Sequence, residues 1–423
     1  MPIHIYFLLA AIVFFTSATA SAEVGIAGES RTYVLTRETA DSRKLVNVYE
    51  YLNLSADHIF TDETDFYVGG WFRASAADKD SVGSGSSADE LDYAYLALRS
   101  RTGNGALYAG RVFVNEGVMA GRIDGVYGRT DLVGGLSASV FGGGAVKSGD
   151  SSSSGATAYG GRLAHAAGGL YALGLSYLAE SGDSDAIREE AGIDLRLMPW
   201  SMAELSGLSG YNGKQSEWMR HSWHLTIGPY AGTRLLADYE SVDYGAYMTG
   251  AATGVFRRSG GIIDPDEKMT MSGAAIEFTP SDGLTVTADY RNYSYDIKDD
   301  SNRYGCAMAW IKPESGGAGL SIHRMDSKGD DTGYEEARAY AFTRTEKATL
   351  SADVSASRYD RAINGVDTGW TAAVSGAWSA GASGRLGASV EYASTPDFKS
   401  EIKGFVNYIY RFAAAFGGEA NGN

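Results

Sequence analysis

The sequence contains little cysteine, little proline and an excess of negative charge. Cys306 is the only cysteine among 423 residues, which excludes an internal disulfide framework and any cysteine cluster for a metal. Only 7 prolines accompany 27 tyrosines, 15 phenylalanines and 7 tryptophans, a composition typical of long β-strands. The formal net charge of −16 argues against nucleic acid as a partner.

Long apolar runs are also missing. The longest, IYFLLAAIVFF from Ile5 to Phe15, is too short to cross a bilayer as a helix. It is followed by the small residues Ala20-Ser21-Ala22, which fit the rule for signal-peptide cleavage. We therefore predict a signal peptide over 1–22, an exported mature chain that begins at Glu23, and no transmembrane helix in it. A transmembrane barrel stays open, because its strands carry a weaker signal.

Motifs of catalysis and of cofactor attachment are absent. The sequence has no nucleophile elbow, no HExxH and no phosphate-binding loop. His221 and His224 of HSWH have opposite parities, so they would not share a face of a strand. There is no CxxCH, so the chain attaches no c-type haem itself. We expect no enzyme, no metal site and no cofactor bound by this chain; haem would come only through a partner cytochrome.

Apolar and polar residues alternate along much of the sequence. In 283–293, GLTVTADYRNY, Leu284, Val286, Ala288 and Tyr290 share one parity, while Asp289 and Arg291 fall on the other. Successive side chains of a strand point to opposite faces, so this segment has one apolar face and one charged face. A soluble sandwich would alternate in the same way, with its apolar face in a protein core. The pattern alone leaves open whether protein or lipid covers that face.

Strand length and connections favour lipid. The alternation recurs in about 22 segments of about ten to fourteen residues, long enough to cross a bilayer at a tilt. The connections alternate between short turns such as RTGN (101–104) and PSDG (280–283) and long polar loops such as 77–89, 147–155 and 359–367. We predict an all-β chain, a transmembrane antiparallel up-and-down β-barrel of about 22 strands (20 possible), over 23–412. Residues 413–423 would form a periplasmic C-terminal tail.

The last predicted strand carries an aromatic pattern. Tyr408, Tyr410 and Phe412 share a parity within IKGFVNYIYRF (402–412). This resembles the terminal signal that outer-membrane assembly machinery recognises, although AAAFGGEANGN follows it. An ordinary strand that ends in interfacial aromatic residues is the alternative. The expected location is the outer membrane of a Gram-negative bacterium, with outer-membrane lipid and this machinery as partners.

The charged parity predicts which residues face the lumen. Both signs occur, so the wall would be polar without forming a selectivity ring of one sign. For each residue alone, the simpler interpretation is that it hydrates the lumen and pairs across strands. The predicted lumen-facing residues are Arg162, Asp194, Arg196, Arg220, Arg234, Asp238, Glu240, Asp289, Arg291, Asp353, Arg385 and Glu391.

The segment 99–129 combines charge with glycine. Arg99, Arg111 and Arg122 crowd around Glu116 and Asp124, and glycines at 110, 117, 121, 125 and 128 permit kinks or close backbone approach. The cluster predicts a constriction or a docking surface inside the barrel. A salt-bridged pair of strands with a purely stabilising role is the alternative.

A family resemblance rests on the same region. YLALRSR (95–101), GRVFVNEGVMAGRIDGV (110–126) and RTDLVGGLSASVFGGGAV (129–146) resemble porin-like outer-membrane proteins of anaerobic metal-reducing bacteria. Some members of that group are the barrel components of porin–cytochrome electron conduits. The resemblance implies multihaem c-type cytochromes as possible partners, and no catalytic residue.

The width of the predicted barrel bears on its function. Barrels of about 22 strands normally hold a plug, and the first strand begins almost at the predicted cleavage site, which disfavours a TonB-dependent transporter. The lumen would be filled by an inward-folded 244–268 loop or by a partner protein. The first hypothesis is therefore a conduit, as the sheath of a multihaem cytochrome complex for extracellular electron transfer. The alternatives are a diffusion porin for small polar solutes and a structural barrel for adhesion or assembly.

Overall fold

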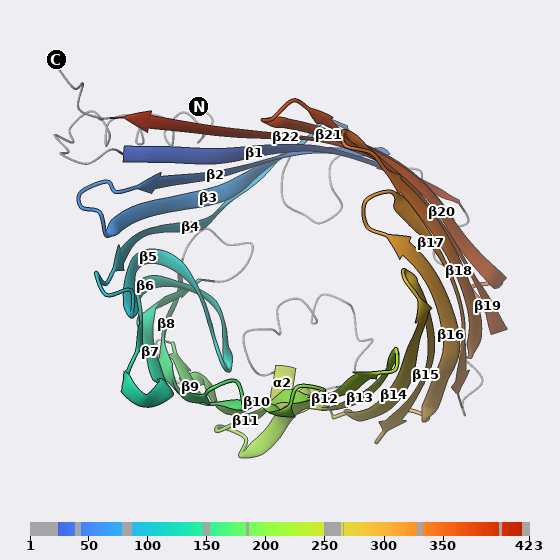
Figure 1. The fold of residues 1–423 in the computed structure, drawn as a ribbon, viewed down its shortest axis with the longest axis horizontal. Helices are drawn as coiled ribbons and strands as arrows, with labels where there is room; N and C mark the ends of the chain where they lie inside the picture. Colours follow the sequence, from blue (N-terminus) through green and yellow to red (C-terminus); the bar gives the residue numbers. More distant parts are fainter. Residues whose placement is uncertain are drawn as a thin grey trace.

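The structure, a computed structural model, is a closed barrel of antiparallel strands (Figure 1). It describes residues 24–38, 44–77, 87–146, 153–182, 186–248, 264, 266–327, 333–396 and 400–416. The predicted signal peptide (1–22) and most of the 244–268 loop lie outside these residues.

The wall consists of 22 strands of 10 to 16 residues, in chain order around the ring. The first eleven are β1 (Val24–Glu38), β2 (Lys44–Asp57), β3 (Thr64–Ser75), β4 (Ser87–Arg99), β5 (Gly105–Glu116), β6 (Met119–Asp131), β7 (Leu136–Val146), β8 (Ser153–Ala167), β9 (Tyr171–Ser181), β10 (Ala186–Trp200) and β11 (Ala203–Asn212).

The other eleven are β12 (Glu217–Tyr230), β13 (Thr233–Asp243), β14 (Lys268–Ser281), β15 (Leu284–Tyr295), β16 (Ser301–Lys312), β17 (Gly316–Ser327), β18 (Tyr334–Arg344), β19 (Ala348–Ile363), β20 (Val366–Ala380), β21 (Gly384–Ser394) and β22 (Glu401–Phe416). A 3-10 turn, η1 (Val133–Gly135), precedes β7, and a short helix, α2 (Tyr244–Met248), follows β13.

Each strand pairs with its neighbours in the chain, and β1 also pairs with β22, from Val24↔Phe416 to Arg37↔Lys403. This pairing closes the sheet and leaves no free edge. The predicted fold class, an up-and-down antiparallel barrel of 22 strands, is confirmed. β22 runs to Phe416, so the first four residues assigned to the tail belong to the strand; 417–423 lie outside the described residues.

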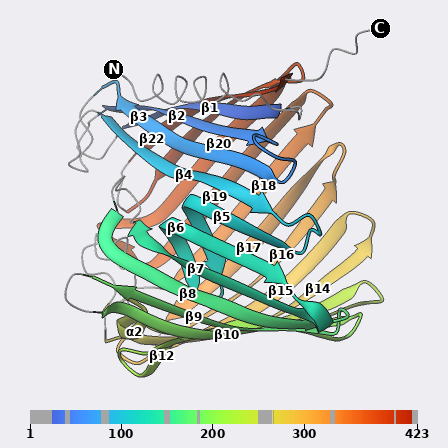
Figure 2. The same ribbon diagram turned by 90° about the vertical axis from the view of Figure 1, so that its left-hand side faces the viewer.

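Short turns gather at one end of the barrel. Even-numbered strands all point toward that end (Figure 2), and turns such as Arg101–Gly103, Ser201–Met202 and Asp282–Gly283 reverse the chain there. One connection at the other end was predicted wrongly: 359–367 is not a long loop. β19 continues through Tyr359 to Ile363, and Asn364-Gly365 forms a tight turn in which both residues have positive φ. An Asn-Gly turn is a strong hairpin signal that outweighs the polarity of the segment.

The outer surface of the wall is apolar. Large apolar side chains on neighbouring strands are exposed side by side, for example Val354 (49 %), Val374 (63 %) and Val390 (59 %) on β19, β20 and β21. Trp310, Trp370 and Trp378 are exposed on the same face. Within the described ranges, no helix has the length and apolarity needed to span a membrane.

Candidate functional site in the lumen

The hairpin of β5 and β6 leaves the wall and enters the barrel. β5 pairs with β4 only from Ala106 to Arg111, and β6 pairs with β7 only from Arg122 to Asp131. The remaining tip, residues 112–121, curves to the inside of the ring and lies over β8 and β9 (Figure 1). We call residues 112–121 the inturned tip.

An apolar core holds the inturned tip against the wall. Val112, Val114 and Met119 of the tip and Ile123 of β6 are 0 to 5 % exposed, and they pack with Phe141 and Leu178 of the wall. Burial of a side chain of this size contributes about 1.5–3 kcal/mol. The tip is therefore a packed element rather than a free loop.

Polar contacts fix the end of the tip. The Val118 amide donates a hydrogen bond to Ser176 Oγ of β9 at 3.1 Å, and Arg188 of β10 donates to the Val118 carbonyl at 3.4 Å. On its other side, Arg122 forms ion pairs with Glu90 and Asp92 of β4. The hairpin is thus attached to the barrel wall on both of its sides, to β9 and β10 on one and to β4 on the other.

A row of three glycines marks where the hairpin bends. Gly110, Gly125 and Gly143 are paired across β5, β6 and β7. A Cβ on Gly125 would lie 2.6 Å from the Gly143 Cα, and a Cβ on Gly110, whose φ is 129°, would lie 3.0 Å from the Tyr95 Cα. Only glycine allows this approach of the backbones, so the glycines flagged in 99–129 have a structural reason at positions 110 and 125.

Contact with the inturned tip identifies the lumen face of the wall. Ser176 touches the tip and therefore faces inward, and it is paired with Gly192 of β10. Paired residues share a face and alternate residues of a strand share a face, so the register extends this assignment around the barrel. The twelve residues predicted to face the lumen all lie on this inward parity, opposite the exposed apolar side chains.

Most of the twelve form ion pairs. Arg162 donates to Asp194 at 2.6 and 3.0 Å across β9, where Gly174 leaves room for the pair. Arg234 pairs with Glu277 at 3.0 Å, and Arg291 lies 4.0 Å from Asp238. The remaining pairs are Arg196–Glu204, Asp238–His224, Asp289–Arg303, Asp289–His323, Asp353–Arg338 and Glu391–Lys403, at 2.6 to 3.1 Å.

Arg220, Glu240 and Arg385 differ from the other nine. Arg220 Nε is buried and has no hydrogen-bond partner among the described residues. Glu240 lies beside Ser222 in the register, and Arg385 is exposed near the short-turn end.

The five residues of the predicted cluster do not form one group. Arg111 and Asp124 face each other across β5 and β6 with hydrogen bonds of 2.7 and 2.8 Å, and Arg122 lies on the same face. Glu116 is on the opposite face, where it accepts a hydrogen bond from Tyr127 and lies 4.0 Å from Arg162. Arg99 is at the short-turn end and pairs with Asp65 at 2.9 Å. The cluster is divided because the hairpin separates its two faces.

Aromatic rings cover the lumen face of the adjoining wall. The first row crosses four strands, from β22 through β1 and β2 to β3, with ring centroids 5.4 to 6.4 Å apart. Its members, which we call the aromatic row, are Phe405, Tyr33, Tyr51, Tyr49 and Trp71.

A second row continues toward the hairpin. Tyr67, Tyr95, Tyr108 and Tyr127 follow one another over β3 to β6 at 5.2 to 5.7 Å. Tyr93 lies flat over Gly69, where a Cβ would come within 2.5 Å of the ring, and donates a hydrogen bond to Asn53 at 2.9 Å. Parity assigns these side chains to the lumen, although the predicted lumen residues include only charged ones.

Histidines and acidic residues are spread over both faces. His221 contacts Ser209 and Trp218 on the outer face, while His224 lies on the lumen face, as the opposite parities predicted. Among the described residues, no three His, Cys, Asp or Glu side chains are grouped as metal ligands.

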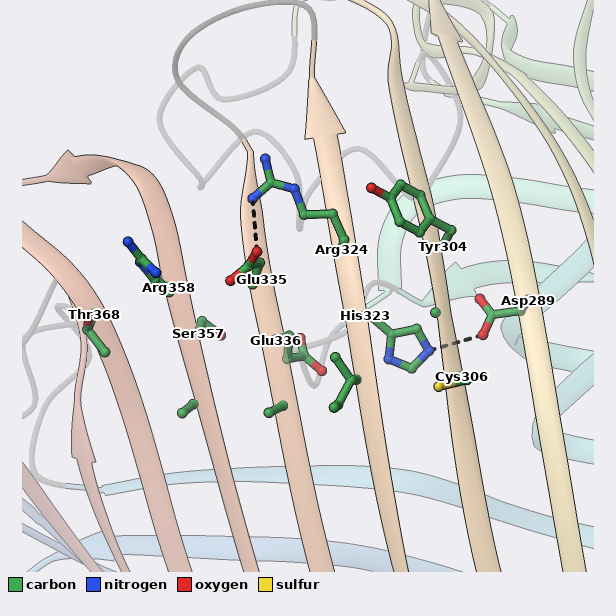
Figure 3. Close-up of a pocket in the computed structure, with 14 residues that line it drawn as sticks. Asp289, Tyr304, Cys306, His323, Arg324, Glu335, Glu336, Ser357, Arg358 and Thr368 are labelled. Atoms are coloured by element: carbon green, nitrogen blue, oxygen red, sulfur yellow. Dashed lines mark hydrogen bonds and ion pairs between the residues drawn. The ribbon is translucent and has the colours of Figure 1, made fainter.

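A pocket of about 740 Å³ lies in the wall of β15 to β20 (Figure 3). Its lining comes from both faces: His323 reaches Asp289 on the lumen side, while the next residue, Arg324, reaches Glu335 on the outer side (Figure 3). Arg324 also pairs with Asp326 and Asp360 near the ends of β17 and β19. The pocket is therefore not a chamber that opens into the lumen alone.

Comparisons with known proteins bear on the fold. The sequence matches no family model and no curated protein. Among solved structures, the ferric enterobactin receptor PfeA of Pseudomonas aeruginosa is similar with a TM-score of 0.57 at 10% identity, over 93% of this chain and 81% of that one. The chain has the fold of large outer-membrane β-barrels.

Two further structures are similar. The siderophore receptor PirA of Pseudomonas aeruginosa has a TM-score of 0.57 at 10% identity, over 92% of this chain and 80% of that one. OccK8 (OprE) of the same organism has a TM-score of 0.44 at 9% identity, over 92% and 98%. At these identities the likeness concerns the fold. The resemblance to barrels of metal-reducing bacteria stays a prediction.

Proposed function

We propose that the protein is an outer-membrane channel for passive diffusion of small polar solutes, narrowed by the inturned tip. The observation that carries this proposal is the packed tip inside a closed 22-stranded wall whose lumen face bears paired charges. The apolar outer face suits lipid, and the charged inner face suits water. The expected location is the outer membrane of a Gram-negative bacterium.

The lumen chemistry supports a route for polar solutes without a preference for one charge sign. Pairs such as Arg234–Glu277 and Arg338–Asp353 place both signs side by side, which keeps the wall hydrated and its net field small. A ring of one sign would instead select ions.

Planar-bilayer recording of the purified barrel tests this function. A steady single-channel conductance from the protein alone is expected. Replacing 112–121 by a short Gly-Ser turn is expected to increase that conductance, whereas the same turn in place of 147–152 is the control. A folded barrel that passes no ions by itself contradicts the proposal.

Sheathing of a multihaem cytochrome is a second candidate, favoured by the strand number, since a wall this wide can enclose a partner. Haem would then belong to the partner. Pull-down of the tagged chain from native membranes followed by a haem stain separates the two functions. A stoichiometric haem protein, in a complex that conducts few ions, supports the sheath; a barrel that purifies alone and conducts supports the channel.

A further inference from the structure

The lumen wall is chemically asymmetric. From β22 through β3 it carries the aromatic row beside ion pairs on β1 and β22, whereas the described residues of β12 to β19 carry ion pairs such as Asp289–Arg303 and Arg338–Asp353 without an aromatic row of this length. The rings of Tyr33, Tyr49 and Trp71 are only partly buried and face the lumen. Apolar ring surface that faces a hydrated channel marks a binding surface more often than a packing requirement.

We propose that the aromatic row is a binding site for neutral sugars, along which an oligosaccharide chain lies during passage. This rests on the proposed channel function and names a substrate class for it. A pyranose ring has an apolar face of C–H groups and a rim of hydroxyls. Aromatic faces pack against the first, and hydrogen-bonding groups beside them satisfy the second.

The spacing of the row fits a chain of rings. Consecutive centroids from Phe405 through Tyr33, Tyr51 and Tyr49 to Trp71 are 5.4 to 6.4 Å apart, with Tyr33 and Tyr51 in an edge-to-face arrangement. A chain of sugar units can therefore follow the row from ring to ring. The row crosses four neighbouring strands and therefore offers an extended binding surface rather than a single pocket.

The flanking polar groups fit a neutral ligand. Asn53 accepts from Tyr93, and Asn47 accepts from Ser75 at 2.9 Å; both amides lie on the lumen face, where their nitrogens and further lone pairs can meet hydroxyl groups. The charges on β1 and β22, beside the Phe405 end of the row, form ion pairs: Glu29 with Arg31 and Arg411, and Glu401 with Arg37 and Lys403. Glu401 and Glu391 balance Arg37 and Lys403, whereas Glu29 lies between two arginines and leaves one positive charge. An aromatic cation is therefore a poorer match, and an aromatic acid is tested below with benzoate.

Binding can be measured on the detergent-solubilised barrel by calorimetry, with maltohexaose as the probe, and by current block in bilayers. Wild type is expected to bind maltohexaose, and Trp71→Ala to weaken binding by about tenfold or more, the scale on which loss of one stacking ring acts. Trp71→Phe keeps a ring face and is expected to retain most of the affinity. Tyr340→Ala is the matched control, because Tyr340 lies on the lumen face of β18, outside the aromatic row and over Gly319.

The outcomes decide the proposal separately from the channel function. A wild-type barrel that conducts but shows neither heat nor current block with maltohexaose overturns the sugar site and leaves the channel intact. Equal weakening by Trp71→Ala and Tyr340→Ala also overturns it. Trp71-dependent binding of benzoate without binding of maltohexaose overturns the assignment to sugars. Calorimetric binding with no conductance supports the site while the channel function fails.

Discussion

Arg162 of β8 and Asp194 of β10 are joined across the intervening strand β9 by hydrogen bonds of 2.6 and 3.0 Å. They meet over Gly174, whose missing side chain leaves space for both groups. The same arginine lies 4.0 Å from Glu116, at the end of the inturned tip. This connects the position of the tip to the charge pattern of the wall.

Removing this arginine is expected to loosen the inturned tip. Arg162→Met leaves Asp194 and Glu116 without their shared cation, so the tip is expected to fluctuate and single-channel current noise to rise severalfold. Arg196→Met is the matched control, because Arg196 pairs with Glu204 through two hydrogen bonds away from the tip. Equal noise in both variants contradicts a role for Arg162 in holding the tip.

The glycine row gives a second test of the tip. Gly125→Val places a Cβ 2.6 Å from the Gly143 Cα and forces the backbones apart, so a larger conductance or a failure to assemble is expected. Gly128→Ala is the control on the same strand, since its Cβ meets nothing nearer than 3.5 Å. Bilayer recording together with heat-modified gel mobility measures both results. A Gly125→Val barrel that assembles and conducts like wild type speaks against the bend.

Adjacent residues of β20 should differ sharply in their tolerance of charge. Val374 is 63 % exposed on the apolar face, whereas Ala373 is paired with Asp353 and Glu391 on the lumen face. Val374→Arg is expected to lower the free energy of unfolding in lipid by about 2–4 kcal/mol, and Ala373→Arg by much less. Urea titration in bilayers measures the difference. Equal losses would mean that lipid does not cover Val374.

The single cysteine is a native site for chemical labelling of the outer face. Cys306 is exposed beside Tyr304 and Met308 on the outer face. In membranes a charged maleimide is expected to leave it unmodified, while a lipophilic maleimide reacts. In the Cys306→Ala background, Ala307→Cys is expected to react with the charged reagent, because residue 307 faces the lumen beside Ser321. Labelling yields by mass spectrometry decide; the reverse pattern contradicts the assignment of faces.

Alternation, strand length and the order of short and long connections predicted the barrel, and parity alone predicted that the twelve charged residues share one face. It could place Arg291 and Asp238 on one face, but not at 4.0 Å from each other, since that distance depends on the register between β13, β14 and β15. The glycines of 99–129 indicated that kinks or close backbone approach are permitted there, and the structure has a bend at Gly110 and Gly125.

The direction of that bend could not be predicted from local sequence. It depends on partners distant in the chain, such as Ser176 for Val118 and Leu178 for the apolar core. The aromatic row could not be predicted for a related reason: Tyr33, Tyr51 and Trp71 become neighbours only once β1, β2 and β3 are in register.

The ladder between β1 and β22 has a consequence for biogenesis. Its fourteen residue pairs join the beginning of the wall to its end, so the ring can seal only after the last strand has been synthesised and delivered. Until then the two edges of the open sheet expose backbone amides and carbonyls whose hydrogen bonds hydrocarbon cannot satisfy. The pairing of β1 with β22 is of the same kind as that of any two neighbouring strands. A circular permutant whose chain begins at the Asn364-Gly365 turn should therefore form the same barrel, closed by a different final pair of strands.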